Sequence, residues 1–257
     1  MKIKSFSTIT LVFLFLIVAY MNPLFAQSQK FIDKDSDAKA IKIADEVMKA
    51  SGGIKNWDAT HFIAWNFFGS RKLLWDKYTG NVRIENVKND TRILVNINTL
   101  KGKVFKNGAE LTNGDSLAKY LQEGKNIWIN DSYWLVMPFK MKDPGVTLKY
   151  ISKDTTQKGN KADVVRLTYK AVGVTPNNAF NVWVNKKTHL VDQWGFYREA
   201  NQPKPNFVQT WEDYLVFGKI KLSGTRGDRK LTDIHVYNYV PDGVFTSFAP
   251  YDVNDFK

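Results

Sequence analysis

The sequence predicts an α+β fold, mainly antiparallel β, with about 11–12 strands, an N-terminal helix and a helical insert near the middle of the chain. Three observations lead to this prediction. Apolar residues recur at helical spacing over residues 38–50. From Trp57 onward, short runs rich in β-branched and aromatic residues follow one another, with turn residues between them. Residues 113–139 break that alternation and carry helix signals instead.

The first 26 residues have the three parts of a secretory signal peptide. Lys2 and Lys4 give a positive start, residues 11–21 are an unbroken apolar run, and residues 23–26 end in a small side chain. The apolar run is shorter than the ~20 residues that a membrane-spanning helix needs, so cleavage is favoured over the alternative of an uncleaved anchor. We therefore predict an exported protein, either periplasmic or secreted.

The predicted mature chain starts at Gln27. Residues 27–37 are polar and unpatterned, which predicts a flexible leader, and residues 38–257 have a suitable length for a single domain with a large core. The chain contains no cysteine, which excludes a lipidated N-terminal cysteine, a disulfide framework and thiol chemistry. The mature protein is thus expected to be unanchored.

The chain is basic, with a formal net charge of +12, and removal of Lys2 and Lys4 leaves +10. Such a charge favours anionic partners. The lysines are scattered along the sequence and do not form a stripe, so they also suit a purely solubilising role. We expect a monomer that makes at most a transient contact with an anionic membrane surface and has no nucleic-acid partner.

The N-terminal helix has both a start and a stop signal. Ser36 or Asp37 can cap it, and residues 51–53, Ser-Gly-Gly, supply the glycines expected just past a helix end. The apolar positions at helical spacing are Ala40, Ile43, Ala44, Val47 and Met48.

Five strands should follow, joined by tight turns that favour antiparallel pairing. They are residues 60–68, 72–78, 82–87, 91–97 and 102–105. The first of them is apolar on both faces, including Trp65 and Phe67, and is therefore predicted to lie centrally. Ile93, Val95 and Ile97 share one face, which predicts a sheet with that face buried.

The insert is predicted to hold two short helices. Residues 113–116, Asn-Gly-Asp-Ser, cap a helix over residues 117–123 that Gly124 stops, and residues 131–139 form a second helix that Pro138 ends. The sheet then resumes with seven further strands. They are residues 146–152, 163–170, 180–185, 190–197, 207–217, 219–222 and 231–240.

Enzyme signatures are missing from the sequence. It has no nucleophile elbow, no phosphate-binding glycine loop and no zinc-protease motif, and its three histidines lack a partner at ligand spacing. We therefore predict no catalytic residue, no metal and no cofactor. A glycosidase-like carboxylate pair is an open alternative, because such a pair forms only in the fold. The candidates are Asp192, Glu199, Glu212 and Asp213.

Residues 226–228, Arg-Gly-Asp, have the composition of an adhesion tripeptide. They lie in the densest basic segment of the chain, residues 219–230. We interpret the tripeptide as a solvated turn and the segment as a hairpin tip; contact of the segment with anionic headgroups is the alternative.

The segment with most functional content is residues 134–146, which places several aromatic and aliphatic side chains just before a Pro-Gly turn. A helix here can fold over the concave face of the sheet. Its aromatic residues, with those of the later strands, either fill an ordinary core or enclose an apolar cavity with room for an acyl chain. Tryptophan and tyrosine suit the rim of such a cavity because one end of the ring is apolar and the other can form hydrogen bonds.

Three sequence features carry a family resemblance. They are residues 50–53, Ala-Ser-Gly-Gly, followed by Trp57; residues 134–146; and residues 211–214, Trp-Glu-Asp-Tyr, leading into Lys221-Leu222. With the order helix, five strands, helical insert and remaining strands, the chain resembles the lipoprotein-localisation (LolA/LolB-like) superfamily over residues 38–248. The features are most similar to those of an exported branch of unknown function.

This resemblance implies an incomplete, half-open β-barrel with a central helical plug. It also implies a carrier, without enzymatic activity, for a lipid or a lipoprotein acyl chain. Trp134, Leu135, Met137 and Phe139 would then face the cavity from the plug. The full set of predicted cavity-lining residues is Trp65, Phe67, Trp128, Trp134, Leu135, Met137, Phe139, Trp183, Trp194 and Trp211.

Two other functions are compatible with the sequence. A secreted carbohydrate-binding or glycan-acting protein would use Trp183, Trp194 and Trp211 as exposed stacking platforms. An envelope scaffold would have no small ligand at all.

Overall fold

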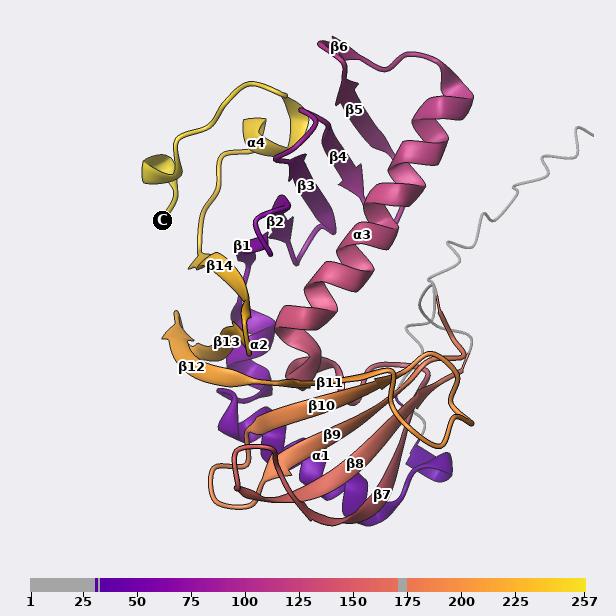
Figure 1. The fold of residues 1–257 in the computed structure, drawn as a ribbon. Coiled ribbons are helices and arrows are strands. Elements are labelled where there is room, and N and C mark those ends of the chain that lie inside the picture. Colours follow the sequence, from indigo (N-terminus) through magenta and orange to yellow (C-terminus); the bar gives the residue numbers. More distant parts are fainter. Residues whose placement is uncertain (1–30, 32, 171–174) are drawn as a thin grey trace, which may run out of the picture.

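The computed structural model describes residue 31, residues 33–170 and residues 175–257. The predicted signal peptide lies outside the described residues. The described chain forms one nine-stranded and one five-stranded sheet, in which all paired strands are antiparallel and neither sheet closes into a barrel. Figure 1 shows the long central helix passing from one sheet to the other. The predicted α+β, half-open arrangement is therefore confirmed.

The nine-stranded sheet is built from two parts of the chain. The first part is β1 (Phe62–Phe67), β2 (Arg71–Asp76), β3 (Asn81–Asn86), β4 (Arg92–Asn96), β5 (Gly102–Lys106) and β6 (Ala109–Glu110). The second part is β12 (Glu212–Phe217), β13 (Ile220–Arg226) and β14 (Arg229–Tyr237). The last strand, β14, pairs with β1, so the order is β12-β13-β14-β1-β2-β3-β4-β5-β6. This pairing confirms the predicted central position of β1.

The five-stranded sheet comes from one continuous part of the chain. Its strands are β7 (Val146–Thr155), β8 (Lys161–Tyr169), β9 (Ala179–Asn185), β10 (Val191–Tyr197) and β11 (Phe207–Thr210), in the order β11-β10-β9-β8-β7. The described residues thus hold 14 strands, more than predicted. One addition is the short β6. The other arises because the predicted strand over residues 207–217 is divided at Trp211, where the chain leaves one sheet for the other.

The helices are α1 (Ala38–Ala50), α2 (Ile54–Ala59), α3 (Gly114–Lys140) and α4 (Gly243–Thr246), with 3-10 turns η1 (Asp33–Asp35) and η2 (Val253–Asp255). The predicted N-terminal helix is confirmed as α1. None of the helices in the described ranges combines the length and the apolar character needed to cross a membrane.

Asp37 occupies the N-cap position of α1 as predicted, but its side chain and that of Ser36 bind the five-stranded sheet. The Ser36 hydroxyl accepts a hydrogen bond from the backbone N–H of Leu148 at 3.0 Å, and the Asp37 carboxylate accepts one from the backbone N–H of Tyr150 at 2.9 Å. This backbone hydrogen bond, together with the Lys149 ammonium, lowers the pKa of Asp37. The last residues of the predicted leader are therefore bonded to β7.

The prediction of two short helices in the insert was wrong, because α3 is one helix of 27 residues that runs through Gly124. Gly124 does not stop the helix; it lets the helix approach the sheet. A Cβ atom at this position would lie 2.8 Å from Ile93 Cγ2 and 3.2 Å from Val95 Cγ1. The glycine is thus required by packing against β4, a reason that helix signals in the local sequence cannot reveal.

Gly124→Ala is expected to lower the free energy of unfolding by about 1 kcal/mol. Alanine improves helix propensity by ~1 kcal/mol, but overpacking against the stiff, β-branched Ile93 costs ~1–3 kcal/mol. Urea unfolding followed by tryptophan fluorescence measures the difference. Gly114→Ala is the matched control, since a Cβ there meets no described atom within 4 Å and should leave stability unchanged or slightly higher. A more stable Gly124→Ala variant would contradict the close-approach argument.

The end of α3 depends on a residue from another strand. Pro138 lies inside the helix and has no N–H, so it cannot bond the carbonyl oxygen of Trp134 one turn earlier. The Arg226 guanidinium on β13 donates a hydrogen bond to that oxygen instead. The helix therefore continues to Lys140 and does not end at Pro138 as predicted.

The interpretation of residues 226–228 as a solvated turn needs a partial correction. Gly227 and Asp228 are exposed, but Arg226 is 0% exposed. Its guanidinium lies 3.4 Å from the ring centroid of Trp211 and donates to Ser223 and Thr225 as well as to Trp134. Burial lowers the pKa of Arg226 to about 9, so the group is still charged at neutral pH. The arginine joins the crossover at Trp211 to the end of α3.

Two apolar clusters form the main core. One lies between α3 and the inner face of the nine-stranded sheet, defined by side chains such as Ile63, Ile84 and Ile93. The other lies between α1, the end of α3 and the inner face of the five-stranded sheet, and includes Leu148 and Val182. The expected burial of the face that holds Ile93, Val95 and Ile97 is confirmed.

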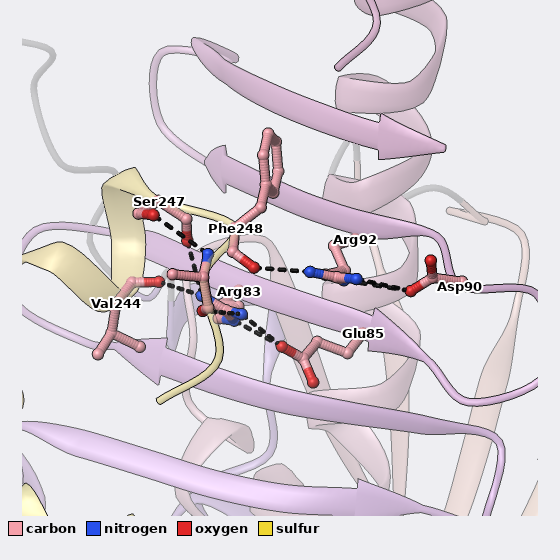
Figure 2. A network of polar contacts seen from close by, with 8 residues as sticks. Arg83, Glu85, Asp90, Arg92, Val244, Ser247 and Phe248 are labelled. Carbon is pink, nitrogen blue, oxygen red and sulfur yellow. Dashed lines mark hydrogen bonds and ion pairs between the residues drawn. The ribbon is translucent and has the colours of Figure 1, made fainter. Parts of the chain in front are cut away.

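The C-terminal segment covers the opposite, outer face of the nine-stranded sheet and is held there by two arginines (Figure 2). Arg83 is 1% exposed and donates to the carbonyl oxygens of Val244 at 2.9 Å, Ser247 at 2.8 Å and Ala249 at 3.1 Å. Arg92 donates to the carbonyl oxygen of Phe248 at 2.6 Å. This segment is thus fixed to β3 and β4.

Candidate functional site

A cavity of about 560 Å³ lies between the second half of α3 and the inner face of the five-stranded sheet. Its aromatic walls come from both elements. The aromatic lining residues are Trp128, Tyr133 and Trp134 of α3, Tyr169 of β8, Phe180 of β9, Trp194 and Phe196 of β10, and Phe207 of β11.

The strand register explains why the sheet residues face one way. Phe196 is directly opposite Phe180 on one side and Phe207 on the other, so these three side chains share a face. Trp194 is two residues from Phe196 on the same strand and lies on that face as well. Alternation along β9, β10 and β11 thus builds an aromatic wall from residues distant in sequence.

The aromatic rings contact one another across the cavity wall. Phe180 stacks on Trp194 with ring centroids 4.8 Å apart, and Phe196 stacks on Phe207 at 5.1 Å. Trp134 joins the helix to this wall, since it stacks on Phe207 at 5.8 Å and meets Trp194 edge-on at 4.9 Å. The result is an apolar surface that continues from the sheet onto α3.

The charged and amide side chains that line the cavity are more exposed, and most of them pair with one another. Lys140 and Asp143 form an ion pair, and the Asn178 amide donates to the Thr175 hydroxyl at 2.6 Å. The side chain of Lys140 is 24% exposed and that of Asp143 is 37% exposed. This pairing leaves the cavity without a net charge from these two groups.

Two tyrosines add buried hydroxyl groups to the cavity lining. The hydroxyls of Tyr133 and Tyr169 share a hydrogen bond. Burial raises the pKa of both groups, and the negative charge of Asp143 raises them further. Both tyrosines therefore stay protonated at physiological pH.

Three of the ten predicted residues line this cavity, namely Trp128, Trp134 and Trp194. Four others lie in the packed core between α3 and the nine-stranded sheet: Trp65, Phe67, Leu135 and Phe139. Met137 and Trp211 are buried in the core beside the five-stranded sheet. The structure therefore divides the predicted set between a cavity and two packed cores.

Trp183 lies on the face of β9 that points away from the cavity, since its neighbours Val182 and Val184 point into the core. It is half-buried, and its indole N–H donates to Asp154 at 2.8 Å. Trp194 is 1% exposed and Trp211 is 2% exposed. Two of the three stacking platforms that a carbohydrate-binding protein would need are therefore buried.

The sequence reasoning missed Tyr133, Tyr169 and Phe180 as lining residues. A usable signal was present, because Phe180 and Phe196 each occupy the core-facing positions of their strands, at spacing two from a buried apolar residue. The strand register determines which of these side chains point into the cavity. That register depends on pairing between strands, which no short segment specifies.

The carboxylates considered for a glycosidase-like pair lie elsewhere. Asp192 accepts hydrogen bonds from the amides of Asn160 and Asn185, and Glu212 is paired with Lys158 at 2.6 Å. Neither these two nor Glu199 and Asp213 are among the residues that line the cavity. Within the described ranges, no group of three or more potential metal ligands occurs.

Comparison with known proteins gives structural neighbours only. No family model and no curated protein matches the chain. The structure is similar to a DUF1329 family protein from Desulfovibrio piger ATCC 29098, with 10% identity, a TM-score of 0.45 and coverage of 80% of this chain and 96% of that one.

A second neighbour is a putative outer membrane lipoprotein-sorting protein domain from Vibrio parahaemolyticus, at 11% identity, TM-score 0.39, and 80% and 96% coverage. MucB follows at 13% identity, TM-score 0.28, and 80% and 70% coverage.

Proposed function

We propose that this protein is an exported carrier or binding protein that holds a hydrophobic ligand, a lipid or a lipoprotein acyl chain, in the cavity between α3 and the five-stranded sheet. The observation that carries the proposal is the aromatic lining of this cavity together with its volume of about 560 Å³. Ligand sites in proteins typically measure ~300–1,000 Å³ and are mostly apolar with a few polar groups. The cavity meets both criteria.

The expected affinity is moderate. Each buried methylene contributes ~0.8 kcal/mol, so a chain of about a dozen methylenes gains roughly 10 kcal/mol. Association costs of ~4–15 kcal/mol offset most of that gain. A carrier needs this balance, because it must release its ligand as well as bind it.

Location and partners follow from the same proposal. After signal-peptide cleavage the protein would act in the periplasm or outside the cell, as a monomer without cofactor or catalytic group. A net charge of +10 after removal of Lys2 and Lys4 supports transient contact with anionic membrane surfaces, from which a lipid could be taken. Its partners would be lipids or acylated lipoproteins.

A bromine-labelled stearate should quench the tryptophan fluorescence of the delipidated protein in a saturable manner. Trp134 and Trp194 line the cavity, so they lie within reach of the bromine atoms of a bound chain. Phe196→Glu should weaken this binding by about tenfold or more, because a carboxylate in the apolar cavity must be desolvated when the chain enters.

Phe105→Glu is the matched control, since Phe105 is also a half-buried strand phenylalanine but lies on β5 of the other sheet, against Phe248. It should bind the stearate like the wild type. If no bromine-labelled lipid quenches the fluorescence, the carrier proposal fails and the scaffold alternative gains support. If Phe196→Glu binds as well as Phe105→Glu, the ligand site lies elsewhere.

A further inference from the structure

The hydrogen bond between the Tyr133 and Tyr169 hydroxyls leaves one of their two O–H donors without an acceptor in the pair. Each hydroxyl carries a single donor hydrogen, and one hydrogen bond between the two consumes only one of them. Neither hydroxyl has a further hydrogen-bond partner in the described part of the chain. Since both tyrosines line the cavity, one O–H donor remains for a ligand.

The tyrosine pair is the donor that faces the cavity. The ring N–H groups of Trp128 and Trp194 also lack a hydrogen-bond partner within the described ranges, but these two nitrogen atoms have no accessible surface, so a ligand in the cavity does not reach them. A hydroxyl hydrogen without a partner is matched by an acceptor atom on a ligand. A ligand group that offers only donors would leave it unpaired, at a cost typical of buried unsatisfied groups.

The electrostatics favour a neutral acceptor over an anionic one. Lys140 lines the cavity but is already paired with Asp143. A ligand carboxylate beside the tyrosines would therefore lose its hydration without gaining an unpaired cation. A carbonyl oxygen without charge accepts the same hydrogen bond without that cost.

We propose that the cavity binds an acyl ester and that the Tyr133–Tyr169 pair positions its carbonyl oxygen. This inference rests on the proposed carrier function and specifies its ligand class. It predicts that, among chains of similar length, the cavity binds an ester more tightly than a hydrocarbon and more tightly than a free carboxylate. Tyr133 and Tyr169 are thus positioning residues for the ligand.

The test is displacement of the neutral dye N-phenyl-1-naphthylamine by three ligands delivered from cyclodextrin: methyl decanoate, tridecane and decanoate. Methyl decanoate and tridecane have the same number of heavy atoms, so their affinity ratio isolates the ester. In the Tyr133→Phe/Tyr169→Phe double variant this ratio should fall by roughly 2- to 10-fold, the value of one neutral hydrogen bond. Retained binding of tridecane shows that the variant is folded and that its cavity is intact.

A spectroscopic measurement tests the same contact in the wild type. The infrared carbonyl stretch of ¹³C-labelled methyl decanoate should move to lower frequency on binding and should lose that shift in the double variant. Tyr150→Phe is the matched control, because Tyr150 is a partly buried tyrosine of the same sheet whose hydroxyl donates to Asp163 at 3.1 Å and does not line the cavity. The Tyr150→Phe variant should keep the wild-type affinity ratio of methyl decanoate to tridecane and the wild-type shift of the carbonyl stretch.

The outcomes separate the two proposals. The ester assignment is overturned if the ratio of the affinities for methyl decanoate and tridecane is the same in the wild type and the double variant and the carbonyl band does not move. The carrier function would still stand in that case. If decanoate binds more tightly than methyl decanoate, the argument from charge is overturned. If none of the three ligands displaces the dye, both proposals fail.

Discussion

Replacing Arg226 with methionine is expected to lower the free energy of unfolding by about 3 kcal/mol. Arg226 is fully buried and donates hydrogen bonds to three backbone carbonyls, those of Trp134, Ser223 and Thr225. Methionine keeps the apolar stem but leaves these acceptors unpaired, at a cost of ~1–3 kcal/mol for a buried group. It also removes the contact of the guanidinium with the Trp211 ring, worth about 2 kcal/mol in a desolvated setting. Relief of the buried charge offsets part of this loss.

A second substitution tests the reason for this cost. Pro138→Ala restores an N–H that can bond the Trp134 carbonyl from within α3. Arg226→Met should therefore cost about 1 kcal/mol less in the Pro138→Ala background than in the wild type, measured by urea unfolding of the four proteins of the cycle. Arg229→Met, at an exposed arginine of the neighbouring strand, should change stability by less than about 0.5 kcal/mol. Strict additivity of the two substitutions would show that Arg226 does not replace the proline's missing donor.

Arg71→Leu is expected to destabilise the protein by about 3–5 kcal/mol. Asp131 of α3 is 0% exposed, and Arg71 at the start of β2 binds both its oxygens, with Nε 2.8 Å from Oδ2 and Nη2 3.0 Å from Oδ1. Removal of one partner of a buried ion pair leaves an uncompensated charge, which typically costs this amount. The Asn130 amide, 2.9 Å from Oδ1, compensates it only in part.

The loss should depend on pH in a defined direction. Burial raises the pKa of Asp131 above its unfolded value of 3.8, and Arg71 opposes that rise. Without Arg71 the pKa rises further, so the folded variant binds a proton more tightly than the unfolded chain. When a carboxyl group has a higher pKa in the folded state than in the unfolded state, the free energy of unfolding falls as pH rises from the unfolded pKa through the folded one. The deficit of Arg71→Leu relative to the wild type should therefore narrow as pH falls toward about 4.

The double variant Arg71→Leu/Asp131→Leu provides the control for this prediction. It has no buried charge at this site, so it should be more stable than Arg71→Leu at neutral pH and should lack the narrowing at low pH. Chemical unfolding at a series of pH values measures all three proteins. A deficit for Arg71→Leu that is the same at every pH would contradict the assignment of the cost to a buried carboxylate.

The strands could be predicted from local sequence because they follow the period of two, and turn residues mark their ends. The first five predicted strands each correspond to an observed one, from β1 to β5, with ends that differ by at most two residues. The buried face of β4 also follows from alternation alone. These features depend on nearby residues, so one sequence is sufficient to find them.

The features that the sequence did not predict all depend on distant contacts. Residues 207–217 contain no glycine or proline, so no turn signal marks Trp211 as the point where the chain changes sheets. Gly124 resembles a helix stop until β4 is placed against it. Arg226 resembles part of a polar turn until the carbonyl left free by Pro138 is placed beside it. Strand register likewise decides which of the predicted lining residues face the cavity and which lie in the packed core.

The pairing of β1 with β14 sets an order for folding. The five-stranded sheet uses only residues 146–210, so its strands pair over short separations along the chain. The centre of the nine-stranded sheet instead joins residues separated by most of the chain, a contact of high sequence separation that closes slowly. Until residues 229–237 arrive, β1 has a free edge able to pair with another chain. A protein of this design therefore depends on its last strands to avoid aggregation during folding.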